Sequence, residues 1–393
     1  MPLITDTDTL AAFCEGLKGA DYITLDTEFM RESTYWPQLC LVQVAGPVDD
    51  DGKAPEGSGA VIDPLAEGID LAPLDELLHD DSMVKVLHAA RQDLEIFYKR
   101  SGRLPAPIFD SQVAAMVCGF GDQVAYDKLV AQLAGAEIDK SSRFTDWSRR
   151  PLTDRQIHYA LSDVTHLRQV FLALKAQLEE NGRTPWLAEE MGRLTDPRTY
   201  AMQPEDAWLR VKTRGAKPRA LAVLREVAAW RERAAQERDI PRNRLLRDEA
   251  LLDIAGHPPT DEAGLSRIRG MPRGFAQGPM GKALMAAIKR GIDTPKSEWP
   301  MQDRQPRKAK PPASIVELLR VLLRVKAEEH DVAQRLIATS DDLEAIAADD
   351  AAEVAALAGW RREIFGEDAL ALKAGKLALA VGGARPRVIP LED

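Results

Sequence analysis

The sequence predicts an α/β domain over residues 1–200 that is followed by two all-helical domains. Before residue 200, short apolar runs alternate with segments of helical periodicity, which is typical of an α/β fold. After it, strand patterns disappear and only helical patterns remain. Between the two helical parts, residues 293–312 hold five prolines among basic residues, a composition typical of a linker. We therefore expect domains at 1–200, 205–292 and 313–393.

The strands of the first domain are predicted where short apolar runs lie between turn signals. They cover residues 21–28, 39–44, 60–63 and 83–88. The stretch 46–59 is rich in Asp, Gly and Pro and is expected to be a loop. A sheet built from these strands is the expected centre of the domain.

Two helices of the first domain have clear boundaries in the sequence. A helix over 89–100 follows the fourth strand and ends before the prolines at 105 and 107. Thr153 and Gln156 form a capping-box pattern, because a threonine cap is followed three residues later by a glutamine. A long helix is therefore predicted from about residue 154 to about residue 178.

The two helical domains look like diverged copies of one unit, offset by 92 residues. Residues 235–240 match residues 327–332 in pattern. Further matched positions are Leu251 with Leu343, Ile254 with Ile346, and Leu265 with Leu357. Similar helices also arise by chance, but the number of matches favours a true repeat.

The charge of the chain is unevenly distributed. The net charge is −10 overall, yet it is −14 for residues 1–200, +7 for residues 201–292 and −3 for residues 293–393. A basic middle segment is suited to bind phosphates, while the acidic first domain is suited to hold a cation. Uneven charge on solvated helices gives the same numbers, so this observation alone leaves both interpretations open.

Composition excludes several classes of protein. Apolar residues make up 45% and charged residues 29% of the chain, which excludes wholesale disorder. Three widely spaced cysteines indicate neither a disulfide framework nor a zinc site. We find no signal-peptide pattern and no apolar run of the roughly 20 residues that a membrane span needs. A soluble cytoplasmic protein is expected.

The first candidate site is the pair Asp26 and Glu28. Residues two apart on a strand point to the same face, so both carboxylates are expected on one side of the sheet. Strand interiors disfavour aspartate, and such violations are typical of functional sites. Taken alone, the pattern also fits an exposed strand end.

Two further acidic residues follow strands or lie in helices. Asp93 lies in the first turn of the helix after a strand, where sheets of this type place ligands and where a helix dipole also favours an acid. Tyr159 and Asp163 are four residues apart in the capped helix and share one face. His158 lies about 140° from Asp163. His88 is expected near the site or in the core.

Together these groups predict a metal site. The carboxylates of Asp26, Glu28, Asp93 and Asp163 would repel one another severely without a cation. Mg²⁺ and similar ions prefer oxygen ligands, and two of them about 4 Å apart can catalyse phosphodiester hydrolysis. We therefore expect two divalent metal ions, Mg²⁺ or Mn²⁺.

The order Asp26-x-Glu28, Asp93, Tyr159-x-x-x-Asp163 resembles the DEDD family of 3′-5′ exonucleases, and its tyrosine matches the DEDDy branch. Within that branch the chain is similar to the ribonuclease D family of bacteria. The similar segments are residues 26–31, 39–43 and 146–152. The helical domains resemble HRDC domains, most clearly over residues 229–242.

This resemblance implies a ribonuclease-H-like mixed sheet flanked by helices, with two HRDC-like domains after it. It implies two-metal hydrolysis that releases 5′-nucleotides from an RNA 3′ end, with the four carboxylates as metal ligands and Tyr159 orienting the attacking water. His158 has the spacing of the sister branch, but only Tyr159 shares the helix face of Asp163. Transfer RNA precursors are the implied substrate.

Several residues are candidates for substrate binding. Phe29 and Met30 follow the acidic strand and would wedge against terminal bases, with burial in the core as the alternative. Gln43 would hydrogen-bond the terminal nucleotide. Further candidates are His88, Arg143, Arg149 and Arg150, the three arginines lying in a basic stretch with two aromatic residues.

Two other functions remain compatible with these residues. One is a DNA-directed 3′-5′ exonuclease, and the other is an inactive RNA-binding protein that kept the fold. The intact set of acids argues against inactivity, because clustered acids without metal would weaken the fold. No phosphate-binding loop with a Gly-Lys-Ser/Thr ending is present, so ATP dependence is not expected. A monomer is expected.

Overall fold

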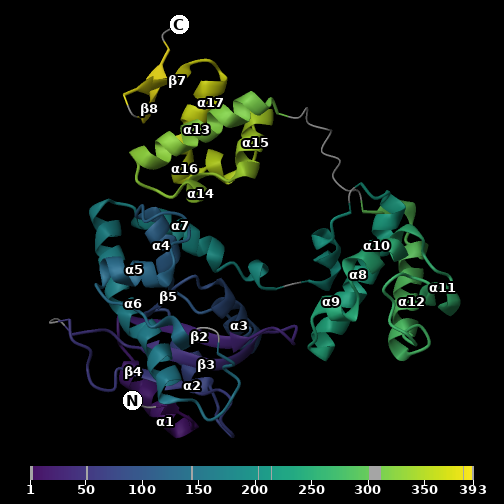
Figure 1. Ribbon diagram of the computed structural model, residues 1–393, viewed down its shortest axis with the longest axis horizontal. Helices are drawn as coiled ribbons and strands as arrows, with labels where there is room; N and C mark the ends of the chain where they lie inside the picture. The colour runs from purple at the N-terminus through teal and green to yellow at the C-terminus, as the bar shows by residue number, and fades with distance from the viewer. Residues whose placement is uncertain are drawn as a thin grey trace.

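The computed structural model describes residues 3–49, 52–142, 145–201, 203–213, 215–300, 311–383 and 385–391, and all statements below refer to them. The sheet lies in the N-terminal part of the chain, helices α8 to α12 form a second body, and the C-terminal helices form a third (Figure 1). Each body has an apolar core of its own. No helix in these ranges is both long and apolar enough to cross a membrane.

The first domain is built on a mixed sheet of six strands in the order β1-β4-β3-β2-β5-β6. Strands β2, β3 and β4 pair in antiparallel fashion, whereas β1, β5 and β6 add parallel pairs. The bounds are β1 Leu3–Ile4, β2 Tyr22–Met30, β3 Gln38–Ala45, β4 Gly59–Ile62, β5 Val84–Leu87 and β6 Ile108–Asp110. The sequence predicted β2, β3, β4 and β5 and missed β1 and β6, which have only two and three residues.

Seven helices accompany this sheet. They are α1 Thr7–Leu17, α2 Ala72–Leu78, α3 Arg91–Ser101, α4 Ser111–Val117, α5 Tyr126–Leu133, α6 Asp154–Glu180 and α7 Thr184–Leu194. The sequence analysis predicted α3 and α6 and missed the others. The signal for α1 was present, because Asp6 caps it and buried Leu10, Cys14 and Leu17 repeat at helical spacing.

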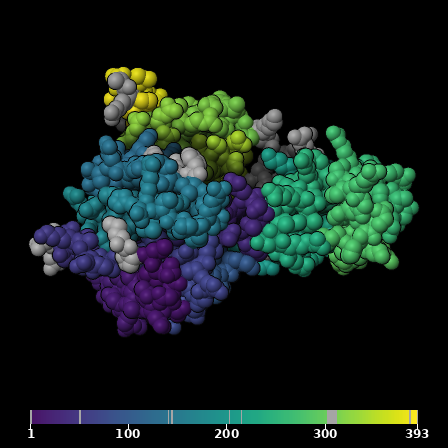
Figure 2. Space-filling view, turned by 60° about the horizontal axis from the view of Figure 1, so that its bottom comes forward, coloured from purple at the N-terminus to yellow at the C-terminus, as the bar shows by residue number. Residues whose placement is uncertain are grey.

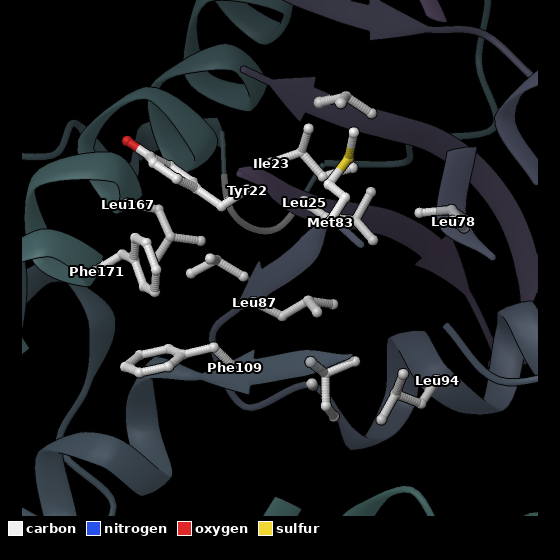
Figure 3. Close-up of a cluster of buried hydrophobic side chains, with 14 of the residues drawn as sticks. Tyr22, Ile23, Leu25, Leu78, Met83, Leu87, Leu94, Phe109, Leu167 and Phe171 are labelled. Carbon is white, nitrogen blue, oxygen red and sulfur yellow. The ribbon is translucent and has the colours of Figure 1, made fainter. Parts of the chain in front are cut away.

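Alternate residues of β2 face different layers. Tyr22 lies 4.6 Å from Phe171 of α6 between ring centres, and the Thr24 hydroxyl donates to the Val164 carbonyl of α6 at 2.8 Å. Figure 3 shows Tyr22 beside Phe171, whereas Ile23 lies in the apolar cluster on the other side of the strand. The even-numbered positions of β2 therefore face α6, and this sets the orientation of Asp26 and Glu28.

The capping box that the sequence predicted at the start of α6 is present. The Thr153 hydroxyl accepts from the Gln156 backbone N–H at 3.3 Å, and the Gln156 side chain accepts from the Thr153 N–H at 2.9 Å. The cap satisfies backbone donors at the helix end and so fixes where the helix begins. This start determines which α6 side chains face β2.

The second body contains α8 Pro218–Arg238, α9 Arg242–Leu245, α10 Asp248–Gly256, α11 Glu262–Ser266 and α12 Pro279–Asp293. A 3₁₀ helix over Pro204–Arg210 precedes them and packs on α8. Helix α12 runs to Asp293, and Trp299 Nε1 donates to the Thr294 carbonyl at 2.9 Å. The first part of the predicted linker 293–312 is thus folded, and residues 301–310 lie outside the described residues.

The third body contains α13 Ala313–Glu329, α14 Gln334–Ile337, α15 Ser340–Ala348, α16 Gly359–Arg361 and α17 Glu367–Lys373. Helices α14 and α15 begin and end 92 residues after α9 and α10, which supports the predicted repeat. Asp239 and Asp331, which are matched by the same offset, both have left-handed backbones with φ of 48° and 46°.

The prediction that residues 313–393 are all helical is wrong. Strands β7 Leu377–Gly382 and β8 Arg385–Pro390 form an antiparallel hairpin after α17. The sequence carried the signal, because apolar residues alternate with alanine from Leu377 and two glycines follow, which is typical of a tight hairpin turn. Gly383 has φ of 71°, a conformation that few other residues adopt.

Candidate active site

The structure brings three of the four predicted carboxylates together. Asp26 and Glu28 lie on the α6 face of β2, and Asp163 reaches them from α6. One carboxylate oxygen from each of the three lies within 4.8 Å of the other two. The predicted convergence of Asp26, Glu28 and Asp163 is therefore confirmed.

Asp93 stands beside this group rather than within it. It lies in the first turn of α3 and is buried, and its carboxylate accepts a hydrogen bond from the Thr27 hydroxyl. Burial and, after it, the charges of Asp93 and Asp163 raise the pKa of both Asp26 and Glu28, so the four acids form one electrostatic group. Thr27 was missed by the sequence analysis, although a threonine between two acids on a strand is itself a signal.

Tyr159 shares the helix face of Asp163, as predicted. Burial and the nearby Asp163 carboxylate raise the pKa of its phenol. The ring stacks on Trp147 at 6.1 Å between ring centres, with 26° between the planes. His158 is exposed and its charge acts on His166. The geometry therefore favours Tyr159 over His158 as the residue at the carboxylates.

The carboxylates carry an unbalanced charge. Burial and the charges of Asp163 and Asp93 raise the pKa of Glu28 to about 8. Burial also raises the pKa of Asp93 and of Asp163 to about 7 each. Among the described residues, no lysine or arginine forms an ion pair with any of the four acids. A cation is the missing counter-charge.

These residues fit a divalent metal ion. Oxygen atoms of ionised carboxylates are the ligands that Mg²⁺ and Mn²⁺ prefer, and the three closest acids supply them from two elements. A bound cation would favour the ionised forms and reverse the rise in their pKa.

A cavity of about 520 Å³ opens on the carboxylates. Asp26, Tyr159 and Asp163 are among the residues that line it. The lining also includes residues that the sequence analysis did not select, among them Gln112, Gln123 and Tyr126. The Tyr126 hydroxyl donates to the Asp163 backbone carbonyl and so fixes the middle of α6.

His88 lines the same cavity, and a contact between His88 and the substrate stays a prediction. Its Nδ1 lies 2.9 Å from the Ser111 hydroxyl, and its ring is 5.2 Å from the Tyr126 ring. Burial lowers the pKa of His88, so the neutral imidazole is favoured. A neutral histidine can exchange hydrogen bonds with a nucleotide without adding charge.

Three other predicted substrate contacts are buried to different extents. Phe29 is half-buried, and Met30 packs on the apolar cluster that contains Trp147. Gln43 is fully buried opposite Asp26 in the neighbouring strand, and its side-chain amide has no hydrogen-bond partner among the described residues. The structure does not place Gln43 where a nucleotide could reach it.

The prediction that Arg150 binds substrate is wrong. Its guanidinium forms a bidentate ion pair with Asp63, and it also donates to the carbonyls of Trp147 and Arg149 at 2.8 Å and Cys40 at 2.9 Å. All five N–H donors are thus used within the protein. Arg150 anchors the loop before α6 to the sheet.

Arg149 and Arg143 have different outcomes. The Arg149 Nε donates to Asp146 Oδ2 at 3.1 Å. Because 84% of its side chain is exposed, Arg149 remains open to solvent. Arg143 lies outside the described residues. A substrate contact by either arginine stays a prediction.

The mixed sheet, its helices and the acidic group define a nuclease of the 3′-5′ exonuclease class. Residues 1–179 match the 3′-5′ exonuclease family, and residues 220–288 match the HRDC domain. Ribonuclease D of Nitrobacter hamburgensis is 53% identical over 392 residues, with 100% of both chains covered. Ribonuclease D of Acidiphilium cryptum is 50% identical, covering 99% of this chain and 97% of that protein.

A solved structure extends this relationship to the whole fold. The crystal structure of Escherichia coli RNase D, which is described as an exoribonuclease involved in structured RNA processing, is 31% identical. It superimposes with a TM-score of 0.81 and covers 95% of this chain and 98% of its own. The chain belongs to the ribonuclease D family of 3′-5′ exoribonucleases.

Proposed function

We propose that Asp26, Glu28, Asp93 and Asp163 together hold two divalent metal ions, Mg²⁺ or Mn²⁺, at which RNA is hydrolysed from its 3′ end. The observation that carries this proposal is the approach of three carboxylates to within 4.8 Å at the wall of a cavity. Bound divalent ions lower the pKa of water and neutralise charge that develops on phosphate and leaving oxygen.

In this proposal, residues of the chain orient the water that attacks the RNA. Water attacks the last phosphorus, the bond from phosphorus to the 3′ oxygen breaks, and a 5′-nucleotide leaves while the shortened RNA keeps a 3′ hydroxyl. The pKa of Tyr159 is raised by burial and by Asp163, so its phenol keeps its proton and can hold the attacking water by hydrogen bonds. This role assigns the chain to the DEDDy branch.

We infer that the substrates are structured RNAs with an accessible 3′ end, transfer RNA precursors in particular. The support is the description of E. coli RNase D as a processor of structured RNA and the net charge of +7 over residues 201–292. Helices α14 and α15 repeat α9 and α10, which supports a second HRDC-like domain over 313–393.

The remaining proposals concern the organisation of the protein. We place the catalytic domain at 1–200, the first HRDC-like domain at 205–292 and a linker between the helical domains. The three cysteines are buried and free, which supports a location in the reducing cytoplasm. The enzyme is proposed to act as a monomer without ATP.

One experiment tests the site and the reaction together. The purified protein is incubated with a 5′-labelled RNA that has a 3′ overhang, with Mg²⁺ or with EDTA, beside the Asp26→Asn variant and a DNA of the same sequence. We expect a metal-dependent ladder from the 3′ end that the variant loses and that is weaker on DNA. Equal digestion of DNA would favour a general exonuclease, and tight binding without shortening would favour an inactive RNA-binding protein.

A further inference from the structure

A second cavity lies between the catalytic domain and the first helical domain. Its volume is about 450 Å³, and four segments far apart in sequence contribute to it. They are the loop after β2, the first turns of α3, the connector around residues 199–210, and α9 with the residue before it. Figure 2 shows the purple N-terminal segment meeting the teal and green helical domain.

The contact between the two domains fixes the walls of this cavity. The backbone N–H groups of Tyr35 and Trp36 donate to Asp239 Oδ1 at 3.0 and 2.9 Å. The Tyr35 hydroxyl donates to the buried Glu232 and accepts from Gln236 at 3.2 Å. Because Tyr35 also packs on the core of the helical domain, the loop after β2 is held in place.

The charge of the cavity is positive. Its lining contains four arginines, Arg31, Arg91, Arg210 and Arg242, and two of them are already engaged by acids. Arg31 forms a bidentate pair with Glu95 at 2.7 and 2.8 Å, and Arg242 lies 3.9 Å from Glu232. Arg91 and Arg210 are exposed and have no carboxylate within ion-pair distance among the described residues. A bound anion would supply the counter-charge and the hydrogen-bond acceptors that both guanidinium groups lack.

The position of Arg91 relates this cavity to the carboxylates. Arg91 and Asp93 are two residues apart in the first turn of α3, so their side chains leave the helix about 200° apart. Arg31 follows Glu28 by three residues on the other contributing segment. The first cavity is thus lined by Asp26 and Asp163, and the second by residues of the two segments, β2 with its loop and α3, that carry Glu28 and Asp93.

We propose that the second cavity binds a backbone phosphate of the RNA upstream of the scissile bond, with Arg91 and Arg210 as its donors. Arginine suits this role because its planar guanidinium gives two parallel hydrogen bonds to a phosphate. Trp36 and Tyr200 add an aromatic wall on which a base or ribose packs. The inference rests on the proposed function and assigns the site a substrate class: single-stranded 3′ segments longer than a dinucleotide.

The test compares substrates of two lengths. The double variant Arg91→Gln with Arg210→Gln is assayed on a dinucleotide and on a single-stranded RNA of about twelve nucleotides. We expect KM for the longer RNA to rise at least about tenfold, because two charge-assisted contacts are lost. Turnover and KM for the dinucleotide should change by less than about twofold, because it is too short to reach the second cavity.

A binding measurement in EDTA gives a readout that does not depend on activity. The slope of log Kd against log salt concentration should fall by about 0.7 in the double variant, since one lost phosphate contact on a single strand accounts for about 0.7. The matched control is the double variant Arg267→Gln with Arg269→Gln, which removes two exposed arginines after α11 in the first helical domain. Its salt slope should stay close to that of the unmodified protein. Arg91→Lys with Arg210→Lys should restore part of the lost slope.

The outcomes separate this proposal from the proposed function. An unchanged salt slope and unchanged KM for the longer RNA would overturn the second site while leaving the exonuclease intact. An equal loss on both substrates would also overturn it, because the arginines would then act on the carboxylates. If the unmodified enzyme shortened neither substrate with Mg²⁺, the proposed function itself would fail.

Discussion

Arg150 and Asp63 are joined by two hydrogen bonds, from Nε to Oδ2 and from Nη2 to Oδ1, each 2.6 Å long. Asp63 follows β4, and Arg150 lies in the loop before α6. The same loop carries Trp147, whose ring stacks on Tyr159. The ion pair thus connects the end of β4 to the residue that we assign to the attacking water.

Replacing Arg150 with glutamine should lower the stability of the catalytic domain by about 2–3 kcal/mol. Breaking a fully buried pair costs about 3–5 kcal/mol, and the value is reduced here because Arg150 is 26% exposed. Thermal unfolding measures the effect. Arg149→Gln is the control, since its side chain is 84% exposed and its loss should change stability by no more than about 0.5 kcal/mol. Equal effects of the two variants would contradict the anchoring role.

Tyr159→Phe should lower kcat by about 10²-fold, within the range for loss of a positioned proton-transfer group. KM should change little, because the ring and its stacking on Trp147 are retained. His158→Ala should leave kcat within about twofold, because His158 is exposed and lies off the Asp163 face. Steady-state kinetics on one RNA decide between them, and the opposite ranking would reverse the assignment.

Thr27→Val should weaken metal binding by about tenfold, the lower end of the effect of losing a partner of a metal ligand. The Thr27 hydroxyl donates to Asp93 and thereby lowers the pKa of Asp93. Without it, Asp93 is harder to ionise, so more Mg²⁺ is needed for half-maximal rate and the pH profile moves to higher pH. Thr27→Ser keeps the hydroxyl and should restore both values; failure of that rescue would indicate a packing effect instead.

Metal removal should make the protein less stable at alkaline pH. The pKa values of Glu28, Asp93 and Asp163 are raised to about 8, 7 and 7. Their contribution to stability is therefore fully present below about pH 4, where the unfolded chain also binds the protons, and is lost as pH rises through about 7–8. Melting temperatures in EDTA should fall between about pH 6 and pH 8.5.

Added Mg²⁺ should raise the melting temperature more at the higher pH, because ligands must be ionised to bind it. The Asp26→Asn and Asp163→Asn double variant supplies the comparison, with fewer acids to repel one another. The melting temperature of this variant should depend less on pH in EDTA and should hardly change when Mg²⁺ is added. A Mg²⁺ shift that is equal in the variant would place metal binding elsewhere.

The sequence predicted which carboxylates lie close together because the signals for their placement are local. The two-residue period of a strand placed Asp26 and Glu28 on one face, and the cap at Thr153 set the register of α6. Contacts between segments far apart in the sequence could not be predicted from these local signals. Arg150 looked like a phosphate ligand until the fold brought Asp63 to it, and Gln43 looked available until α6 covered its strand.

The matched aspartates Asp239 and Asp331 have a consequence for how the two helical bodies are attached. Asp239 accepts from Tyr35 and Trp36, while Asp331 contacts Gly119, and its carbonyl accepts from Arg183 at 3.0 Å. The two aspartates hold corresponding positions in the two helical bodies, yet they meet different surfaces of the catalytic domain. Each attachment can therefore be altered without loosening the other.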